Sequence, residues 1–265
     1  MKVFISADIE GVTTIANWEE SEPKNASYAA HAEQMTKEVL AACEGAIAAG
    51  AKEIVIKDAH GSGYNINPAL MPRQAVLIRG WSNYPTCMAE GIDGSFDAAM
   101  FVGYHSAAGR GGNPMSHTLT GSHTGIFING RRASEFMIYS WAAAYYGVPT
   151  VFLSGDKMLC EDYADLHPAL HAVAVKDGSG GATFCRSVAL TIPEIRAASE
   201  ASLRQNLAGA VAALPDGFDV EIHYKDHGRA LKVSYFPDVK RIDDNKVAFS
   251  RKDYYEVLRT VMWIC

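Results

Sequence analysis

The sequence has few cysteines, and none of them are paired in a metal-binding or redox spacing. The five cysteines are scattered along the 265 residues and form no Cys-x-x-Cys motif. A chain of this length buries enough apolar surface to fold without cross-links. An odd number of scattered thiols is typical of a reducing compartment rather than of a disulfide framework. We therefore expect a cytoplasmic protein.

Long apolar runs and concentrated positive charge are also missing. No stretch reaches the roughly 18 uninterrupted apolar residues of a membrane-spanning helix, and the short apolar start lacks the length of a signal peptide. Lys and Arg total 24 against 30 Asp and Glu, which gives a net charge of −6, and basic residues occur only as isolated pairs. The pattern argues against a membrane or a nucleic acid as partner.

Several catalytic motifs are absent as well. The first predicted strand is not followed by Gly-x-Gly-x-x-Gly, and the chain contains neither a Walker A loop nor His-Glu-x-x-His. The Gly-Ser-Gly strings at 61–63 and 178–180 lack the flanking pattern of a nucleophile elbow. Dinucleotide binding, phosphate-loop chemistry, a serine nucleophile and a helical zincin site are therefore disfavoured.

What the sequence does contain is an alternation of short apolar strands and longer helices. Strands are predicted at 2–7, 53–57, 75–78, 98–102, 150–153 and 172–175, and helices at 26–48 and 133–146. Gly125 to Ile128, followed by Asn129-Gly130, predicts a hairpin. The alternating order predicts an α/β fold with a mostly parallel open sheet and flanking helices.

The C-terminal part follows another pattern, which predicts a smaller α+β portion. A helix is expected from Pro193 to Ala213, because proline is favoured in the first turn of a helix. Two antiparallel strands are expected between Asp219 and Phe236, and a last helix over 252–263. We divide the chain into a catalytic α/β domain, residues 1–176, and residues 177–265, which pack on it or contribute to assembly.

Acidic and histidine residues directly follow three of the predicted strands. Asp8 and Glu10 follow the first strand, His60 the second and His105 the strand at 98–102. Open α/β sheets bind ligands in the crevice at the carboxyl ends of their strands. Glu135 lies near the start of a predicted helix, where a carboxylate suits the positive end of the helix dipole.

Each of these residues alone has an ordinary explanation. Asp8 and Glu10 are either a metal clamp or a solvated acidic pair at a strand end. A lone histidine such as His60 or His105 is more often structural or exposed than a ligand, and Glu135 is most often a simple helix charge. His117, in a Gly- and Pro-rich loop, is a proton shuttle or a surface residue.

The combination is more informative than its parts. Two histidines and three carboxylates suit a divalent ion such as zinc, which accepts nitrogen and oxygen ligands. Five protein ligands exceed what one tetrahedral zinc takes, so we expect two zinc ions per subunit. With Asp8 as the bridge, each ion keeps a position for water.

The same residues lie in strings that resemble the D-aminopeptidase family, the DppA-like M55 metallopeptidases. The resemblance extends in order and spacing to about residue 160, and the C-terminal part adds little to it. The strings that carry it are Val3 to Gly11, Lys57-Asp58-Ala59-His60, Phe101 to His105, Met115-Ser116-His117 and Asn129-Gly130 with Ser134-Glu135.

The resemblance implies a zinc-dependent aminopeptidase that hydrolyses short peptides or aminoacyl amides, with D-amino acids at the N-terminus. It also implies a homo-oligomer, a ring-shaped decamer whose active sites face an internal chamber. The family's bridging aspartate falls on Asp8 and its catalytic histidine on His117. Its other metal ligands fall on Glu10, His60, His105 and Glu135.

Two other functions remain open. The first is a metal-dependent hydrolase of a different amide or ester, including L-peptides and phosphoesters. A phosphatase requires basic groups near the metals, and Lys57 and Arg110 are near the site residues in sequence. The second is a non-catalytic metal-binding assembly protein, which predicts saturated coordination. Whether His117 acts as a nucleophile or as a general acid–base is also open.

Overall fold

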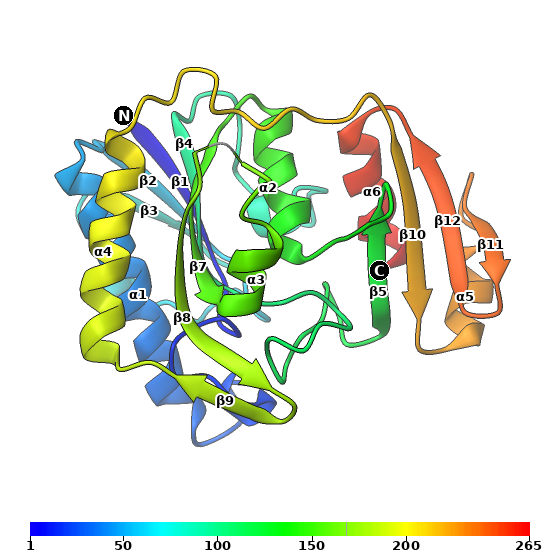
Figure 1. Cartoon of the computed structure of the whole chain (residues 1–265), viewed down its shortest axis with the longest axis horizontal. Helices are drawn as coiled ribbons and strands as arrows, with labels where there is room; N and C mark the ends of the chain where they lie inside the picture. Colours follow the sequence, from blue (N-terminus) through cyan, green and yellow to red (C-terminus); the bar gives the residue numbers. More distant parts are fainter. Residues whose placement is uncertain (168) are drawn as a thin grey trace.

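The computed structural model describes residues 1–167 and 169–265 and is organised around two β-sheets (Figure 1). The larger sheet has the strand order β3-β2-β1-β4-β7-β8-β9. Its strands are parallel except for the β8–β9 pair. The prediction of a mostly parallel α/β sheet is thus confirmed. The strands are β1 (Lys2–Ala7), β2 (Glu53–Asp58), β3 (Ala75–Ile78), β4 (Ala98–Tyr104), β7 (Thr150–Asp156), β8 (His171–Ser179) and β9 (Ala182–Cys185).

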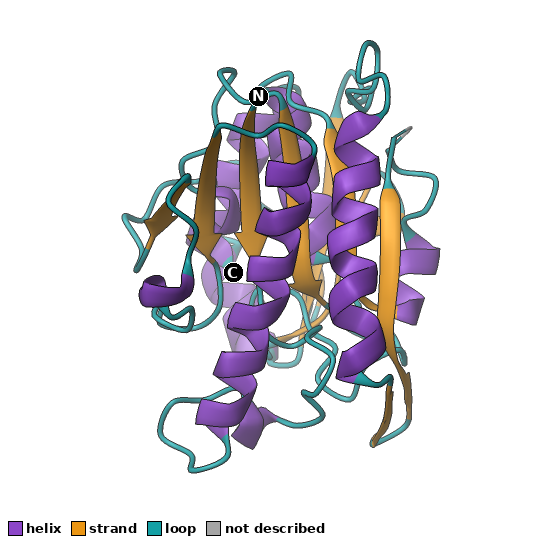
Figure 2. Cartoon of the chain, turned by 90° about the vertical axis from the view of Figure 1, so that its left-hand side faces the viewer, coloured by secondary structure: helices purple, strands orange, loops and turns teal. Residues whose placement is uncertain are grey.

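Helices cover both faces of this sheet. On one face α1 (Tyr28–Ala48) and α4 (Val188–Arg204) lie side by side (Figure 2). They pack so closely at Gly45 that a Cβ atom there would lie 2.3 Å from the backbone oxygen of Arg196. On the other face lie α2 (Glu135–Tyr145) and α3 (Lys157–Asp162). Among the described helices, none is long and apolar enough to cross a membrane.

A second sheet is antiparallel and has the order β11-β12-β10-β5-β6. The hairpin predicted at Asn129-Gly130 is confirmed, because both residues have positive φ angles, 50° and 76°, in the turn between β5 and β6. Helix α6 (Tyr254–Ile264) lies between this sheet and α2, and α5 (His227–Val233) packs on β10 and β12. The strands are β5 (His123–Ile128), β6 (Arg131–Arg132), β10 (Phe218–Tyr224), β11 (Lys240–Asp243) and β12 (Lys246–Arg251), and short 3-10 helices are η1 (Trp18–Glu20), η2 (Pro68–Leu70) and η3 (Cys87–Ala89).

Two expectations for the C-terminal part are wrong. The helix predicted at 193–213 begins at Val188 and ends at Arg204, so Pro193 lies inside it. The helix continues through Pro193 because it packs against α1, although proline has no backbone N–H to donate to the helical hydrogen bonds. The second strand expected before Phe236 is helix α5, because Asp226 accepts a hydrogen bond from the Gly228 N–H and caps a helix there.

The two sheets take their strands from interleaved parts of the chain. The expected division between residues 176 and 177 falls inside β8, and α4 packs on α1 beside the parallel sheet. Conversely, β5 and β6 precede that division but extend the antiparallel sheet through pairing with β10. The division of the chain into a catalytic domain, residues 1–176, and a smaller portion, residues 177–265, stays a prediction.

His167 provides a test of the core around Phe136, which packs between α2 and β4 of the parallel sheet. Its ring is buried against Phe136, and neither ring nitrogen has a hydrogen-bond partner among the described residues. Burial, together with the charge of Arg131, lowers the pKa of His167 to about 4. The folded protein therefore holds this imidazole neutral, whereas the unfolded chain protonates it near its ordinary pKa of about 6.5.

We expect His167 to destabilise the protein as the pH falls from about 6.5 to 4, because protonation then favours the unfolded chain. When the pH is lowered from 7.5 to 5, the free energy of unfolding of His167→Phe should rise by on the order of 2 kcal/mol relative to that of the wild type. Urea unfolding of the chelator-treated proteins at both pH values measures this difference. A difference between the two proteins that is the same at both pH values would contradict the expectation.

Candidate metal centre

The predicted site residues meet where the order of the parallel sheet reverses. Strand β1 lies between β2 and β4, so the connections after β1 and β4 diverge and open a crevice at their carboxyl ends. Asp8 directly follows β1 and His105 directly follows β4. Glycines allow these ends to approach, because a Cβ atom on Gly11 would lie 1.8 Å from the Tyr104 oxygen, and one on Gly103 2.3 Å from the Asp8 oxygen.

Asp8 lies at the centre of the cluster, and each of its oxygens faces a different histidine. Oδ1 lies 3.4 Å from His60 Nδ1, and Oδ2 lies 3.5 Å from His105 Nε2. His60 Nδ1 is also 2.9 Å from Glu10 Oε2, and His105 Nε2 is 3.2 Å from Glu135 Oε2. All five residues expected as metal ligands therefore lie together, in two groups that share Asp8.

Hydrogen bonds on the outer side fix the orientation of the histidine rings. His60 Nε2 lies 3.0 Å from the Ser21 carbonyl oxygen, and His105 Nδ1 lies 3.0 Å from the Ser106 carbonyl oxygen. A neutral imidazole that donates its proton to such a carbonyl keeps a lone pair on its other nitrogen. Those other nitrogens face the carboxylates, which is the arrangement of metal-ligating histidines with an outer hydrogen-bond partner.

The buried carboxylates of the cluster favour the binding of a positively charged group. Burial and the neighbouring Glu10 carboxylate raise the pKa of Asp8 well above its usual range. Burial opposes a charged His105, yet the carboxylates of Glu135 and Asp8 outweigh it and raise the pKa of His105 to about 10. Three buried carboxylates that compete for two imidazoles are the environment that a divalent cation stabilises.

Unpartnered atoms show that the residues fit a metal ion. Asp8 Oδ2, Glu10 Oε2 and His105 Nε2 are buried and lack a hydrogen-bond partner within residues 1–167 and 169–265. Asp8, Glu10 and His105 offer donor atoms within 4.8 Å of one another, and so do His105, His117 and Glu135. Nitrogen and carboxylate donors that converge at 2.9 to 3.5 Å suit a borderline-hard divalent cation such as zinc.

His117 lies beside this cluster rather than within its centre. Its ring stacks on His105 with centroids 4.4 Å apart and contacts Trp18 of η1 at 5.1 Å. Its Nδ1 lies 2.9 Å from the Met115 carbonyl oxygen, which leaves Nε2 facing the site, 3.5 Å from Glu135 Oε1. The same Glu135 oxygen accepts a hydrogen bond from the Leu119 N–H at 2.6 Å.

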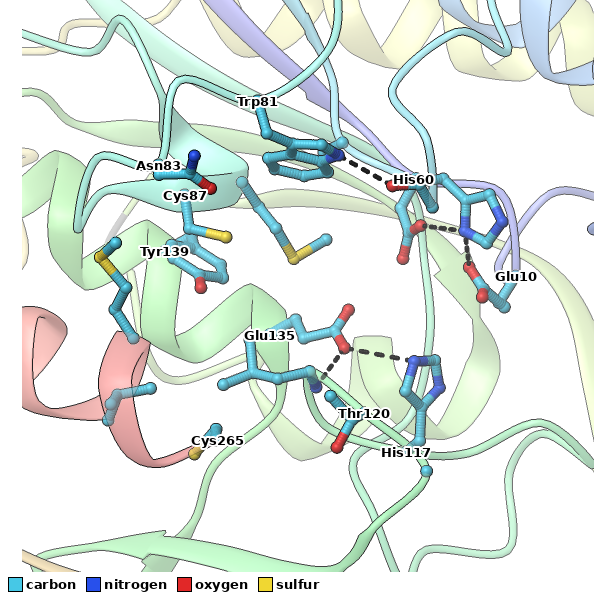
Figure 3. A pocket seen from close by; sticks show the side chains of 18 of the residues that line it. Glu10, His60, Trp81, Asn83, Cys87, His117, Thr120, Glu135, Tyr139 and Cys265 are labelled. Atoms are coloured by element: carbon cyan, nitrogen blue, oxygen red, sulfur yellow. Dashed lines mark hydrogen bonds and ion pairs between the residues drawn. The ribbon is translucent and has the colours of Figure 1, made fainter. Parts of the chain in front are cut away.

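The cluster opens onto a cavity of about 590 Å³, shown in Figure 3. Asp8, Glu10, His60, His117 and Glu135 line one part of it. None of the lining residues within the described chain is a lysine or an arginine. A site of this kind takes a ligand that brings its own uncharged or positively charged groups to a carboxylate-rich centre.

Sequence reasoning missed the residues that hold the Glu10 loop in place. Lys176 of β8 is buried, and its Nζ donates to the carbonyl oxygen of Glu10 and, at 2.7 Å, to that of Ile15. Asn113 Nδ2 donates to the same Glu10 oxygen at 2.9 Å. A lysine directly after the apolar strand pattern at 172–175 was the available signal for such a buried contact.

An α/β sheet with buried histidines and carboxylates at its switch point, open to a cavity, has the architecture of a metal-dependent hydrolase. Comparison with known proteins narrows this class. The sequence profile described as D-aminopeptidase matches residues 1–263. The chain therefore belongs to the D-aminopeptidase family, which confirms the resemblance seen in the sequence.

Individual relatives agree over nearly the whole chain. A D-aminopeptidase of Bacillus subtilis (strain 168) is 26% identical over 264 residues, covering 99% of this chain and 96% of the relative. The solved structure of the zinc-dependent D-aminopeptidase DppA from Bacillus subtilis, described as a self-compartmentalizing protease, superposes with a TM-score of 0.92. That match has 26% identity and covers 100% of this chain and 96% of the other.

We expect Lys176→Met to weaken divalent-cation binding by about 10- to 100-fold, because removal of an outer partner of a ligand-bearing segment has effects of this size. A cobalt titration followed by visible absorption measures the affinity. The exposed Lys157→Met variant, on the neighbouring helix, is the control and should bind like the wild type. Equal affinity of the Lys176→Met protein and the wild type would show that the Lys176 contact does not position the Glu10 loop.

Proposed function

We propose that this protein is a zinc-dependent aminopeptidase that hydrolyses short peptides or aminoacyl amides, with D-amino acids at the N-terminus. The single observation that carries the proposal is the buried set of histidines and carboxylates that opens onto the cavity at the switch point. Membership in the D-aminopeptidase family supports the reaction class. The zinc dependence stated for the Bacillus subtilis relative supports the choice of metal.

In this proposal the chain would hold two zinc ions per subunit, with Asp8 as the residue common to both groups of ligands. Glu10 and His60 would hold one ion, and His105 and Glu135 the other, as the split of the Asp8 contacts suggests. Bound zinc would polarise the scissile carbonyl group and lower the pKa of a water molecule toward neutrality.

His117 is the proposed catalytic group of the chain itself. Its Nδ1 is engaged by the Met115 carbonyl oxygen, so Nε2 is the atom available at the cavity to take up the proton that the water molecule releases. The neighbouring Glu135 carboxylate, 3.5 Å from Nε2, stabilises the imidazolium that results. His117 then returns the proton to the leaving amine, as general base followed by general acid.

The competing functions receive less support. For a phosphoesterase, basic groups are expected beside the metals. Lys57 instead donates to the Gly80 oxygen and lies 3.3 Å from Glu90, and Arg110 pairs with Asp162 at 2.7 Å. For a non-catalytic metal module, a closed coordination shell is expected, whereas four of the five proposed ligands line an open cavity.

The assembly and the setting are further parts of the proposal. The Bacillus subtilis relative is described as self-compartmentalizing, which supports a homo-oligomer for this chain. We propose the ring-shaped decamer that the family resemblance implies, with the active sites inside. A cytoplasmic location is consistent with five free cysteines, of which only Cys185 is exposed.

Two substitutions separate metal binding from catalysis. We expect Asp8→Ala to lose both zinc and activity, because it removes the residue shared by both groups of ligands. His117→Ala should retain zinc and lose about 10²- to 10⁴-fold in kcat, the usual contribution of a general acid–base. Elemental analysis of zinc and hydrolysis of D- and L-alaninamide measure the two properties.

His227→Ala is the matched control, because the side chain of His227 is 82% exposed and lies on α5. It should behave like the wild type in both assays. Full peptidase activity in zinc-free Asp8→Ala protein would refute the proposed function. Faster hydrolysis of the L-amide would correct the chirality without removing the reaction class.

A further inference from the structure

The cavity extends beyond the metal centre into a region that the proposed chemistry does not use. Figure 3 shows Cys87, Tyr139 and Cys265 on the side of the cavity away from Glu10 and His60. We call this region the apolar chamber. It is lined by Cys87, Met88, Tyr139, Val261, Met262 and Cys265.

Three elements from distant parts of the chain form the apolar chamber. Cys87 and Met88 belong to η3, Tyr139 to α2, and the other residues to α6 and its C-terminal cap. Met88, Tyr139 and Val261 are nearly inaccessible to solvent, so this part of the wall belongs to the packed core. Met262 is 36% exposed, which leaves its side chain open to substitution without loss of the core.

The side chains that line the apolar chamber carry no charge at neutral pH. Burial raises the pKa of the Cys265 thiol to about 12 and also raises that of Cys87, so both remain protonated. Arg229 donates to the backbone oxygens of Ile264 and Cys265 and does not line the cavity. An uncharged wall of thiol, thioether, aliphatic and aromatic groups favours an apolar ligand group.

Its position relative to the metal centre indicates which part of a substrate it receives. Tyr139 and Glu135 are four residues apart on α2 and both line the cavity, so they are neighbours on one helix face, with Cβ atoms about 5–6 Å apart. The scissile carbonyl lies at the metal centre. A side chain on the adjacent α-carbon spans a distance of this size.

We propose that the apolar chamber is the subsite for the side chain of the substrate's N-terminal residue and that it selects large apolar side chains over alanine. This inference rests on the proposed aminopeptidase function. The substrates are therefore peptides or amides that begin with a residue such as leucine, methionine or phenylalanine. Extra methylene groups buried in an apolar pocket give about 10- to 200-fold discrimination each.

Aminoacyl amides test this directly, because they contain only one side chain. The zinc-loaded wild type should hydrolyse leucinamide at least about tenfold more efficiently in kcat/KM than alaninamide of the same chirality. Met262→Trp, which narrows the apolar chamber, should bring this ratio close to one. Met262→Ala, which widens it, should raise phenylalaninamide hydrolysis relative to leucinamide.

Trp263→Leu is the matched control, since Trp263 is the next residue of α6, is 67% exposed and does not line this cavity. Its leucinamide-to-alaninamide ratio should equal that of the wild type. The ratio also guards against partial loss of zinc, which lowers both rates equally. The inference is overturned if the wild type hydrolyses leucinamide no more efficiently than alaninamide. It is also overturned if Met262→Trp has the same leucinamide-to-alaninamide ratio as the wild type.

Calorimetry separates failure of the subsite from failure of the proposed function. The zinc-loaded His117→Ala protein is titrated with leucinamide and with alaninamide, so binding is measured without turnover. Tighter binding of leucinamide by tenfold or more supports the apolar chamber even if no amide is cleaved by the wild type. Equal binding of the two amides overturns the inference even if the wild type is an active aminopeptidase.

Discussion

The structure depends on one electrostatic constraint, the burial of three carboxylates at the point where the parallel sheet reverses its order. Asp8, Glu10 and Glu135 are each at most 3% exposed, and the imidazoles of His60, His105 and His117 face them. Isolated buried charges of one sign cost several kcal/mol each unless they are compensated. The histidines supply part of the opposite charge, and the proposed divalent cation would supply the rest.

Much of the surrounding architecture serves to hold these groups at contact distance. The glycines at 11 and 103 let the ends of β1 and β4 approach, and the outer carbonyl oxygens fix the histidine rings. Lys176 and Asn113 converge on the carbonyl oxygen of Glu10 from two other segments. These contacts fix the positions of the proposed ligands, as outer partners of metal-binding side chains do.

The fold near the site could be predicted because local patterns determine it. Strand β1 matches the expected residues 2–7. The proximity of Asp8 and His105 could be predicted because the carboxyl ends of parallel strands meet at one crevice. The start of α2 was two residues from its prediction, and Ser134 caps it by accepting a hydrogen bond from the Met137 N–H. Such signals lie within a few residues of the feature that they predict.

Long-range pairing could not be predicted in the same way. Strand β5 pairs with β10, about ninety residues later, and no local pattern specifies such a partner. The helix containing Pro193 survives through its packing on α1, which outweighs the local preference of proline. The apolar chamber likewise joins η3, α2 and α6, so its wall becomes visible only when the tertiary structure is known.

The most direct test of the central claim is anomalous X-ray diffraction at the zinc absorption edge from crystals of the zinc-loaded protein. The account predicts two peaks roughly 3.5–4 Å apart, one on each side of the Asp8 carboxylate. His60 and Glu10 should contact one ion, and His105 and Glu135 the other. Absence of peaks at Asp8, or zinc bound only elsewhere on the chain, would contradict it.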